Sequence, residues 1–206
     1  RRAMDRKPAD ATETRQLRVR LADALANAGR GAEAATEYLM AAKGASAAER
    51  LDLQRRAAMQ SLISGHIDDG LAALQTVLDA AGMKLARTPL RALLSLLVRR
   101  AELRLRGLHF RQRDTSQITA EELTRIDICW SVAVGLSIVD TIRGADFQTR
   151  NLLLSLRAGE PYRIARALAW EAAHTTTAGG PAVRRTARLL DEAASIAQRI
   201  NHPHAL

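Results

Sequence analysis

The chain has 206 residues and a formal net charge of +9, and 47% of its residues are hydrophobic while only 3% are aromatic. An interior with so few aromatic residues must be built mainly from Ala, Leu, Ile and Val, which suits close helix-on-helix packing. This composition argues against a β-sandwich, whose short strands are rich in Val, Tyr, Thr and Phe. We therefore expect an all-α protein, either one domain or one elongated array of helices.

Cysteine usage and hydropathy restrict the setting of the chain. The single cysteine, Cys129, has no partner for an internal disulfide and no metal-binding spacing around it, so a reducing, cytoplasmic environment fits best. The longest apolar run, at residues 92–98, is far shorter than the ~18 residues that a membrane span requires, and no signal-peptide pattern is seen. The chain starts with RRAMDRKP and stops at NHPHAL, and we expect it to be a segment of a larger protein.

Helix start and stop signals predict roughly nine helices in chain order. Ser46 with Glu49 and Thr119 with Glu122 match the capping box, in which the Ser or Thr oxygen accepts a backbone N–H and the glutamate reaches back to the cap. Glycines follow most of the predicted helices, and Pro161 falls in a first turn, where a missing N–H is tolerated. The predicted helices span residues 11–28, 32–43, 47–64, 67–81, 89–107, 120–143, 146–158, 161–174 and 181–200.

The first two pairs of predicted helices form a repeat. Gly29 and Gly65 lie 36 residues apart and the residues around them correspond, so each pair is expected to be a helical hairpin with a tight glycine turn. Small residues are expected where the two helices of a hairpin approach most closely: Ala22, Ala34, Ala41, Ala58 and Gly70. Larger apolar residues are expected to fill the space around them: Leu21, Leu25, Tyr38, Leu71, Leu74 and Leu78.

This pattern resembles the tetratricopeptide repeat, whose unit has ~34 residues, a small-large pattern and a glycine at the turn. With a third, degenerate unit around Gly159, the resemblance implies one stack of antiparallel hairpins over residues 1–206, clearest at 11–43 and 47–81 and degenerate over 120–200. In that family the first helix of each unit lines a concave groove. The corresponding positions here are Gln16, Arg20, Asp23, Asn27, Asp52, Arg55, Arg56 and Met59. Arginine and asparagine in such a groove can hold a peptide carboxylate or backbone, and a solvated helix face is the alternative for each residue.

Three longer stretches resemble the helical-repeat region that follows the kinase and ATPase modules of large bacterial serine/threonine protein kinases. They begin GHIDDGLAALQTVLDAAGMKL, IDICWSVAVGLSIVDTIRGADFQ and ARLLDEAASIAQRI. The resemblance implies a non-catalytic regulatory or protein-interaction region, whose partner is another protein or other domains of the same chain. Because no Gly-rich phosphate loop and no HRD, DFG or GK[ST] motif occurs, we expect no cofactor and neither binding nor hydrolysis of ATP. An enzyme with an unrecognised site is the rival interpretation.

The positive charge is concentrated in residues 84–113, which hold nine basic residues and one acid. On the predicted helix one apolar face is lined by Leu90, Leu94, Leu97, Ala101, Leu105 and Leu108. Leu96 and Leu103 form a second strip, and arginines separate the two: Arg91, Arg99, Arg100, Arg104 and Arg106. We interpret this segment as a helix held by neighbours on two sides, with arginine stems covering apolar surface. The alternative is a basic module that binds nucleic acid, a membrane surface or an acidic partner, although nucleic acid is not expected because only Phe110 is near for base stacking.

The remaining candidates for chemistry have structural explanations. Asp140 lies in an apolar run where an unpaired carboxylate would be costly, so we expect a buried ion pair with a nearby arginine. The candidate partners are Arg143, Arg150 and Arg166. His202 and His204 supply too few ligands for a metal site, and Cys129 is expected to be a core residue. The sequence therefore predicts no catalytic residue and no metal ligand.

The predicted C-terminal helix carries an apolar stripe, and the chain ends soon after it. The stripe consists of Ala187, Leu190, Ala194 and Ala197, extended by Leu189, Ile196 and Ile200. In a stacked array each unit covers the apolar face of its neighbour. We therefore expect this helix either to expose an apolar patch or to bury it against a second copy, which would form a homo-oligomer.

Overall fold

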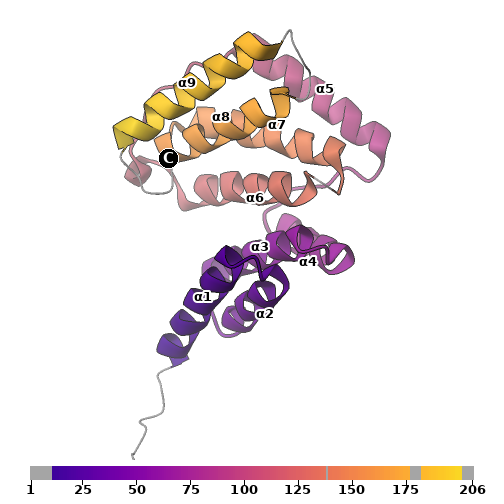
Figure 1. Cartoon of the computed structure of the whole chain (residues 1–206), viewed down its shortest axis with the longest axis vertical. Helices are drawn as coiled ribbons and strands as arrows, with labels where there is room; N and C mark the ends of the chain where they lie inside the picture. Colours follow the sequence, from indigo (N-terminus) through magenta and orange to yellow (C-terminus); the bar gives the residue numbers. More distant parts are fainter. Residues whose placement is uncertain (1–10, 138, 177–181, 201–206) are drawn as a thin grey trace, which may run out of the picture. The chain divides into compact units, whose positions relative to one another are not determined.

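The computed structural model describes residues 11–137, 139–176 and 182–200. Within these ranges it contains nine α-helices, one short 3-10 turn (η1, Thr115–Gln117) and no strand, so the expected all-α class is confirmed (Figure 1). The α-helices are α1 (Ala11–Asn27), α2 (Gly31–Ala42), α3 (Ala47–Ile63), α4 (Ile67–Ala80), α5 (Pro89–Arg106), α6 (Ala120–Leu136), α7 (Thr141–Ala158), α8 (Pro161–Thr176) and α9 (Val183–Ile200). The chain divides into two compact units, unit 1 (Arg1–Met83) and unit 2 (Lys84–Leu206). The prediction that both belong to one array stays a prediction.

Unit 1 consists of two helical hairpins, α1–α2 and α3–α4, and α2 also packs on α3. Gly29 and Gly65 make the hairpin turns at φ of 75° and 85°, in the left-handed region that favours glycine. The small residues predicted at the close contacts are buried, since Ala22, Ala34 and Ala58 have no exposed surface. These predictions of hairpin turns and close contacts are therefore confirmed.

The larger apolar residues of unit 1 follow the prediction with one exception. Tyr38, Leu74 and Leu78 are buried and Leu25 is half-buried, as expected. Leu21 is 49% exposed, so its predicted place between the helices is wrong. The physical reason is the ~100° turn per helical residue, because the face that buries Ala22 against α2 turns its neighbour Leu21 outward.

Unit 2 is organised around α7. Helices α5, α6 and α8 all pack on α7, and α9 packs on α8. The core joins Leu103 of α5 to Leu152 and Leu156 of α7 and to residues of α8 and α9. The predicted α7–α8 turn lies at Gly159, which has φ of 81° and caps α7 in the left-handed conformation.

The boundary between α6 and α7 differs from the sequence prediction. A single helix over residues 120–143 was expected, followed by another from residue 146, but α6 ends at Leu136 and α7 begins at Thr141. Asp140 caps α7 by accepting the backbone N–H of Arg143 at 3.1 Å. Gly144 lies inside α7, where an added Cβ would stand 3.2 Å from the carbonyl carbon of Leu136. The glycine therefore permits close packing of α7 against the end of α6 rather than ending a helix.

The other predicted boundaries agree with the structure to within about two residues. Ser46 and Thr119 cap α3 and α6 with both hydrogen bonds of the predicted capping boxes. Thr88 adds a side-chain cap to α5 that the sequence analysis did not single out. Polar caps at these helix starts satisfy backbone N–H groups that have no partner within the helix.

Candidate functional site

A groove lies between α1 and α3 in unit 1, where the tetratricopeptide resemblance places a binding surface. It has a volume of about 380 Å³ and is called the α1–α3 groove below. Its lining comprises Thr12, Arg15, Gln16, Val19 and Arg20 of α1 and Glu49, Asp52, Leu53 and Arg56 of α3. Each lining residue recurs at helical spacing, so both helices present one face to the groove. The groove therefore combines a small apolar part with three arginines and two acids.

Arg56 is held firmly at one side of this groove. Its guanidinium lies 2.8 Å from Asp52 and 3.4 Å from Asp23, and it sits over the Tyr38 ring at 5.9 Å from the centroid. Burial would lower the pKa of Arg56, but the two carboxylates outweigh it and raise the pKa above its usual value. Burial, together with the hydrogen bond to Asp23, raises the pKa of Tyr38 to about 12. Arg56 is therefore a fixed wall of the groove.

Arg20 differs from the other two arginines of the groove. Arg15 lies 3.9 Å from Glu49, and Arg56 has its two acids. Arg20 is exposed, and no described residue forms an ion pair with it. A guanidinium without an acidic partner can take a carboxylate through two parallel hydrogen bonds. This makes Arg20 the group in the α1–α3 groove that is free to bind an anionic ligand.

The structure gathers about half of the groove residues expected from the sequence. Gln16, Arg20, Asp52 and Arg56 line the groove. Asp23 accepts hydrogen bonds from Tyr38 and Arg56 at its edge. The remaining three expected residues, Asn27, Arg55 and Met59, lie outside the lining. Arg55 hydrogen-bonds to Asp52, and its side chain is only 12% exposed.

Five lining residues were not anticipated: Thr12, Arg15, Val19, Glu49 and Leu53. Positions one helical turn before and after Gln16 include Thr12 and Val19, and Arg15 lies one turn before Val19. Glu49 was noticed only for its capping box, which it does form. Glu49 therefore both caps α3 and lines the groove. Its capping-box pattern explained its presence in the sequence, so its second role was not considered.

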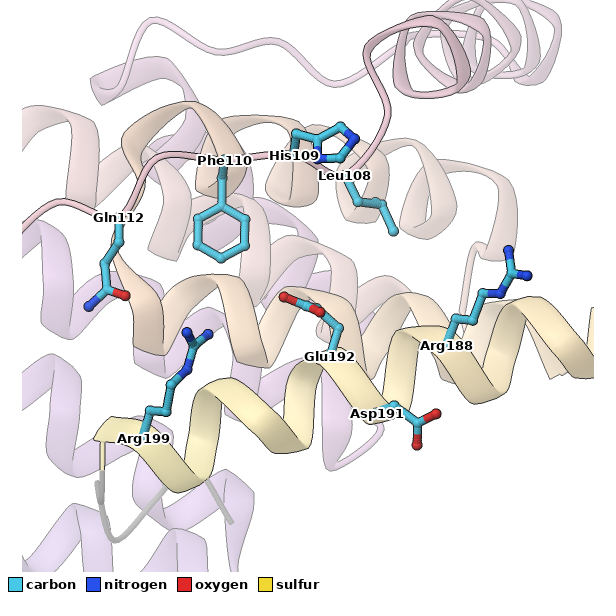
Figure 2. Close-up of a pocket in the computed structure, with 8 residues that line it drawn as sticks. All are labelled: Leu108, His109, Phe110, Gln112, Arg188, Asp191, Glu192 and Arg199. Carbon is cyan, nitrogen blue, oxygen red and sulfur yellow. The ribbon is translucent and has the colours of Figure 1, made fainter.

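A larger hollow of about 730 Å³ lies in unit 2, between α9 and the extended residues that follow α5. Its lining comprises Leu108, His109, Phe110, Gln112, Arg188, Asp191, Glu192 and Arg199. Leu108 and Phe110 also pack against the core of unit 2. Figure 2 shows Glu192 and Arg199 rising from α9 toward the side of Phe110, while Asp191 points away. Because two arginines and two acids line this open hollow, its charge favours neither anionic nor cationic ligands.

Three of the five arginines of the expected basic patch serve the packing of unit 2. Arg100 pairs with the fully buried Glu171 of α8, and Arg99 lies 3.8 Å from Asp146 of α7. Arg106 donates to the backbone carbonyl of Leu156 at 3.1 Å. Arg91 and Arg104, by contrast, are exposed and pair with no described acid. The patch is thus divided between internal anchors and free cations.

The two apolar strips predicted on this helix differ in burial, except that Leu108 of the first strip lies beyond the end of α5 and packs against the core of unit 2. Leu103 is buried and Leu96 is half-buried toward α7, whereas Leu90, Leu94 and Leu105 are strongly exposed. Among the described helices of unit 2, α5 packs substantially on α7 alone. The expectation of neighbours on both sides of this helix is therefore not met in the described part of unit 2.

Two of the candidates for chemistry, Asp140 and Cys129, lie in the described part of the chain. Asp140 pairs with Arg143, one of its three expected partners, but its side chain is 27% exposed and so is not deeply buried. Burial raises the pKa of the Cys129 thiol to about 12, which keeps it protonated and poorly nucleophilic. His202 and His204 lie outside the described residues. No group of three or more metal-ligating side chains gathers in the part of the chain that the structure describes.

The C-terminal helix α9 buries three of the seven residues of its predicted apolar stripe, so the predicted stripe is only partly buried. Leu189, Ile196 and Ala197 are buried, and α9 packs extensively on α8. Leu190 remains 49% exposed, and Ala187 and Ala194 beside it are exposed as well. The expected exposed patch is therefore small. Among the described helices none is both long enough and apolar enough to cross a membrane.

Comparisons with known proteins give this chain no established family. No protein-family model matches the sequence, no curated protein matches it, and no solved structure matches its fold.

Proposed function

We propose that the chain is a non-catalytic protein-interaction module that binds a short acidic peptide segment in the α1–α3 groove. The observation that carries this proposal is Arg20, an exposed guanidinium without an acidic partner among the described residues, set in a groove with Val19 and Leu53. On the sequence resemblance, we place the module in the cytoplasm as the regulatory region of a bacterial serine/threonine protein kinase. Its partner is then another protein or another domain of that kinase.

The chemistry of the groove favours a carboxylate beside an apolar side chain. Arg20 supplies a planar fork for a carboxylate, and Gln16 one turn away can hydrogen-bond a peptide backbone. Val19 and Leu53 offer a small apolar contact. Asp52 and Glu49 repel acids on the opposite side and so restrict where the carboxylate lies. A volume of about 380 Å³ accommodates only a few side chains, so we expect modest affinity.

Fluorescence anisotropy on the full chain tests the peptide proposal. The probes are fluorescein-labelled short peptides that contain Leu and Glu and end in a free carboxylate, each with an amidated counterpart. Arg20→Gln should weaken binding tenfold or more, since a bidentate charged contact contributes on the order of 1.5–3 kcal/mol. Arg50→Gln is the matched control, because Arg50 is exposed on α3 but lies outside the groove lining.

Two results would count against the proposal. In the first, none of the acidic peptides binds at salt concentrations near physiological. In the second, Arg20→Gln and Arg50→Gln weaken binding equally, which would mean general attraction to a basic chain.

Calorimetry with ATP tests the non-catalytic part of the proposal, and stoichiometric binding would contradict it. The kinase context is tested by reading the gene upstream of Arg1. Kinase catalytic motifs in the same reading frame support the context, and their absence from the complete reading frame removes it.

A further inference from the structure

The side of α5 that faces away from α7 is apolar over more than four turns. Five large side chains there are strongly exposed: Leu90 at 79%, Leu94 at 64%, Leu97 at 57%, Val98 at 58% and Leu105 at 90%. Ala101 lies among them and is also exposed. We call these six residues the α5 outer face. A contiguous exposed apolar surface of this size is typical of a site that contacts another molecule or a membrane.

The α5 outer face is a ridge rather than a groove. Ala92 and Leu103 lie on the opposite, buried side of the helix, and among the described helices α7 alone packs substantially on α5. No helix in the described part of unit 2 therefore flanks the outer face to form a wall. A single apolar ridge fits a flat apolar layer better than it fits the grooves that bind helical peptides.

The charges around this ridge are positive. Arg91 and Arg104 flank the outer face on either side, Arg87 precedes the helix, and all three are exposed without an ion pair to any described residue. The single acid of residues 84–113, Glu102, pairs with Arg157. Leucines bordered by arginines are the composition of helices that lie in the plane of an anionic membrane surface.

We propose that the α5 outer face docks on an anionic lipid surface. The leucines enter the boundary between headgroups and acyl chains, and Arg87, Arg91 and Arg104 contact lipid phosphates. A second copy of the chain is a poorer occupant, because pairing two outer faces brings together two segments that each carry nine basic residues and one acid. This surface belongs to unit 2 and does not depend on the α1–α3 groove of unit 1.

Vesicle flotation of the full chain tests this proposal. The probes are phosphatidylcholine vesicles with and without phosphatidylserine. Binding to the anionic vesicles should be roughly tenfold stronger or more, since each arginine near such a surface contributes about fivefold. Rising salt should weaken the binding.

Paired variants separate the two contributions. Leu94→Gln with Leu97→Gln should abolish binding, and Arg91→Gln with Arg104→Gln should reduce the preference for anionic vesicles. The matched control is Leu39→Gln with Met40→Gln, which removes two exposed apolar residues from α2 and should leave binding unchanged. Circular dichroism checks that each variant keeps its helical content.

Several outcomes would overturn the proposal. One is that no vesicle binds the chain, and another is that neutral and anionic vesicles bind it equally. A third is that the control variant loses binding as strongly as the Leu94 and Leu97 variant. Light scattering that shows a dimer, abolished by Leu94→Gln with Leu97→Gln while vesicles have no effect, would instead assign the face to a second copy.

Discussion

The helices of the two units are held together by different kinds of contact. In unit 1 the closest contacts are made by small residues such as Ala22, Ala34 and Ala58, and the charged pairs stay near the surface. In unit 2 the central contacts include buried carboxylates, since Asp146 is 2% exposed and Glu171 has no exposed surface. Unit 1 therefore depends on shape, whereas unit 2 depends on arginines that neutralise charges inside it.

The anchoring of α5 shows the difference most clearly. Its buried apolar contribution to the core of unit 2 is small, and Arg99 and Arg100 reach Asp146 and Glu171 on two other helices. Asp146 also accepts a hydrogen bond from Ser95 at 2.9 Å and pairs with Arg150 at 2.8 Å. Because ion pairs hold one side of α5, the leucines on its other side are not needed for packing within unit 2 and stay exposed.

The largest effect is expected from removing one of these anchors. Arg100→Leu leaves the buried carboxylate of Glu171 with Arg185, at 3.6 Å, as its remaining ion-pair partner among the described residues, and should destabilise unit 2 by about 3–5 kcal/mol. Urea unfolding followed by tryptophan fluorescence measures this, because both tryptophans, Trp130 and Trp170, belong to unit 2.

The double variant Arg100→Leu with Glu171→Leu sharpens this test. It should recover most of the lost stability, since it removes the uncompensated charge together with its partner. If Arg100→Leu costs less than about 1 kcal/mol, the pair behaves like a surface salt bridge and the contrast between the units fails.

A second effect concerns glycine turns that look alike in sequence. Gly65 and Gly159 both have positive φ, but an added Cβ at Gly159 would lie 2.2 Å from the carbonyl oxygen of Arg111, whereas Gly65 has open space around it. Gly159→Ala should therefore cost about 3 kcal/mol or more in unit 2, and Gly65→Ala about 1–2 kcal/mol in unit 1. Thermal unfolding by circular dichroism and tryptophan fluorescence compares the two, and equal losses would show that the contact with Arg111 is unimportant.

A third variant tests the small-residue contacts of unit 1. Ala34 is fully buried, so Ala34→Phe forces the helices apart and should cost about 1–3 kcal/mol. The loss should appear in the helical circular dichroism signal while tryptophan fluorescence, which follows unit 2, stays unchanged. Arg56→Ala is the control, and its partly exposed ion pairs should contribute less than about 1 kcal/mol. An unchanged midpoint for Ala34→Phe would mean that the repeat register is wrong.

The smallest expected effect is a pH dependence of the stability of unit 2. Burial would raise the pKa of Asp127, but hydrogen bonds and charge from Arg163 and Arg166 outweigh it, so the pKa is lowered. A lowered pKa gives stability that is present above the ordinary carboxyl pKa and lost as pH falls through the folded-state value. Asp127→Asn should therefore lose less stability than the unchanged chain as pH falls below about 4. Urea midpoints read by tryptophan fluorescence check this, and parallel pH profiles would contradict it.

Local signals made much of the fold predictable. The capping boxes at Ser46 and Thr119 and the hairpin turns at Gly29 and Gly65 each act within a few residues, so the sequence displays them directly. The α6–α7 boundary was missed because Gly144 looks like a helix end, whereas its role is close contact with Leu136.

Contacts between distant residues were the harder part. Sequence patterns do not show that the carbonyl of Arg111 approaches Gly159 or that Arg100 reaches Glu171. In the α1–α3 groove, Gln16 and Arg20 were found because a repeat pattern marks one helix face. Arg15 and Glu49 were not found, since a groove also takes residues from the edges of each face.

Photo-crosslinking of an acidic peptide tests the proposed function most directly. The peptide carries a benzophenone beside its free carboxylate, and mass spectrometry of the full chain identifies the crosslinked residues. We predict crosslinks on the α1–α3 groove, at Gln16, Val19 or Leu53, that disappear with Arg20→Gln and persist with Arg50→Gln. Crosslinks confined to residues 84–113, or crosslinks that Arg20→Gln leaves unchanged, would contradict the assignment of the groove as the binding site.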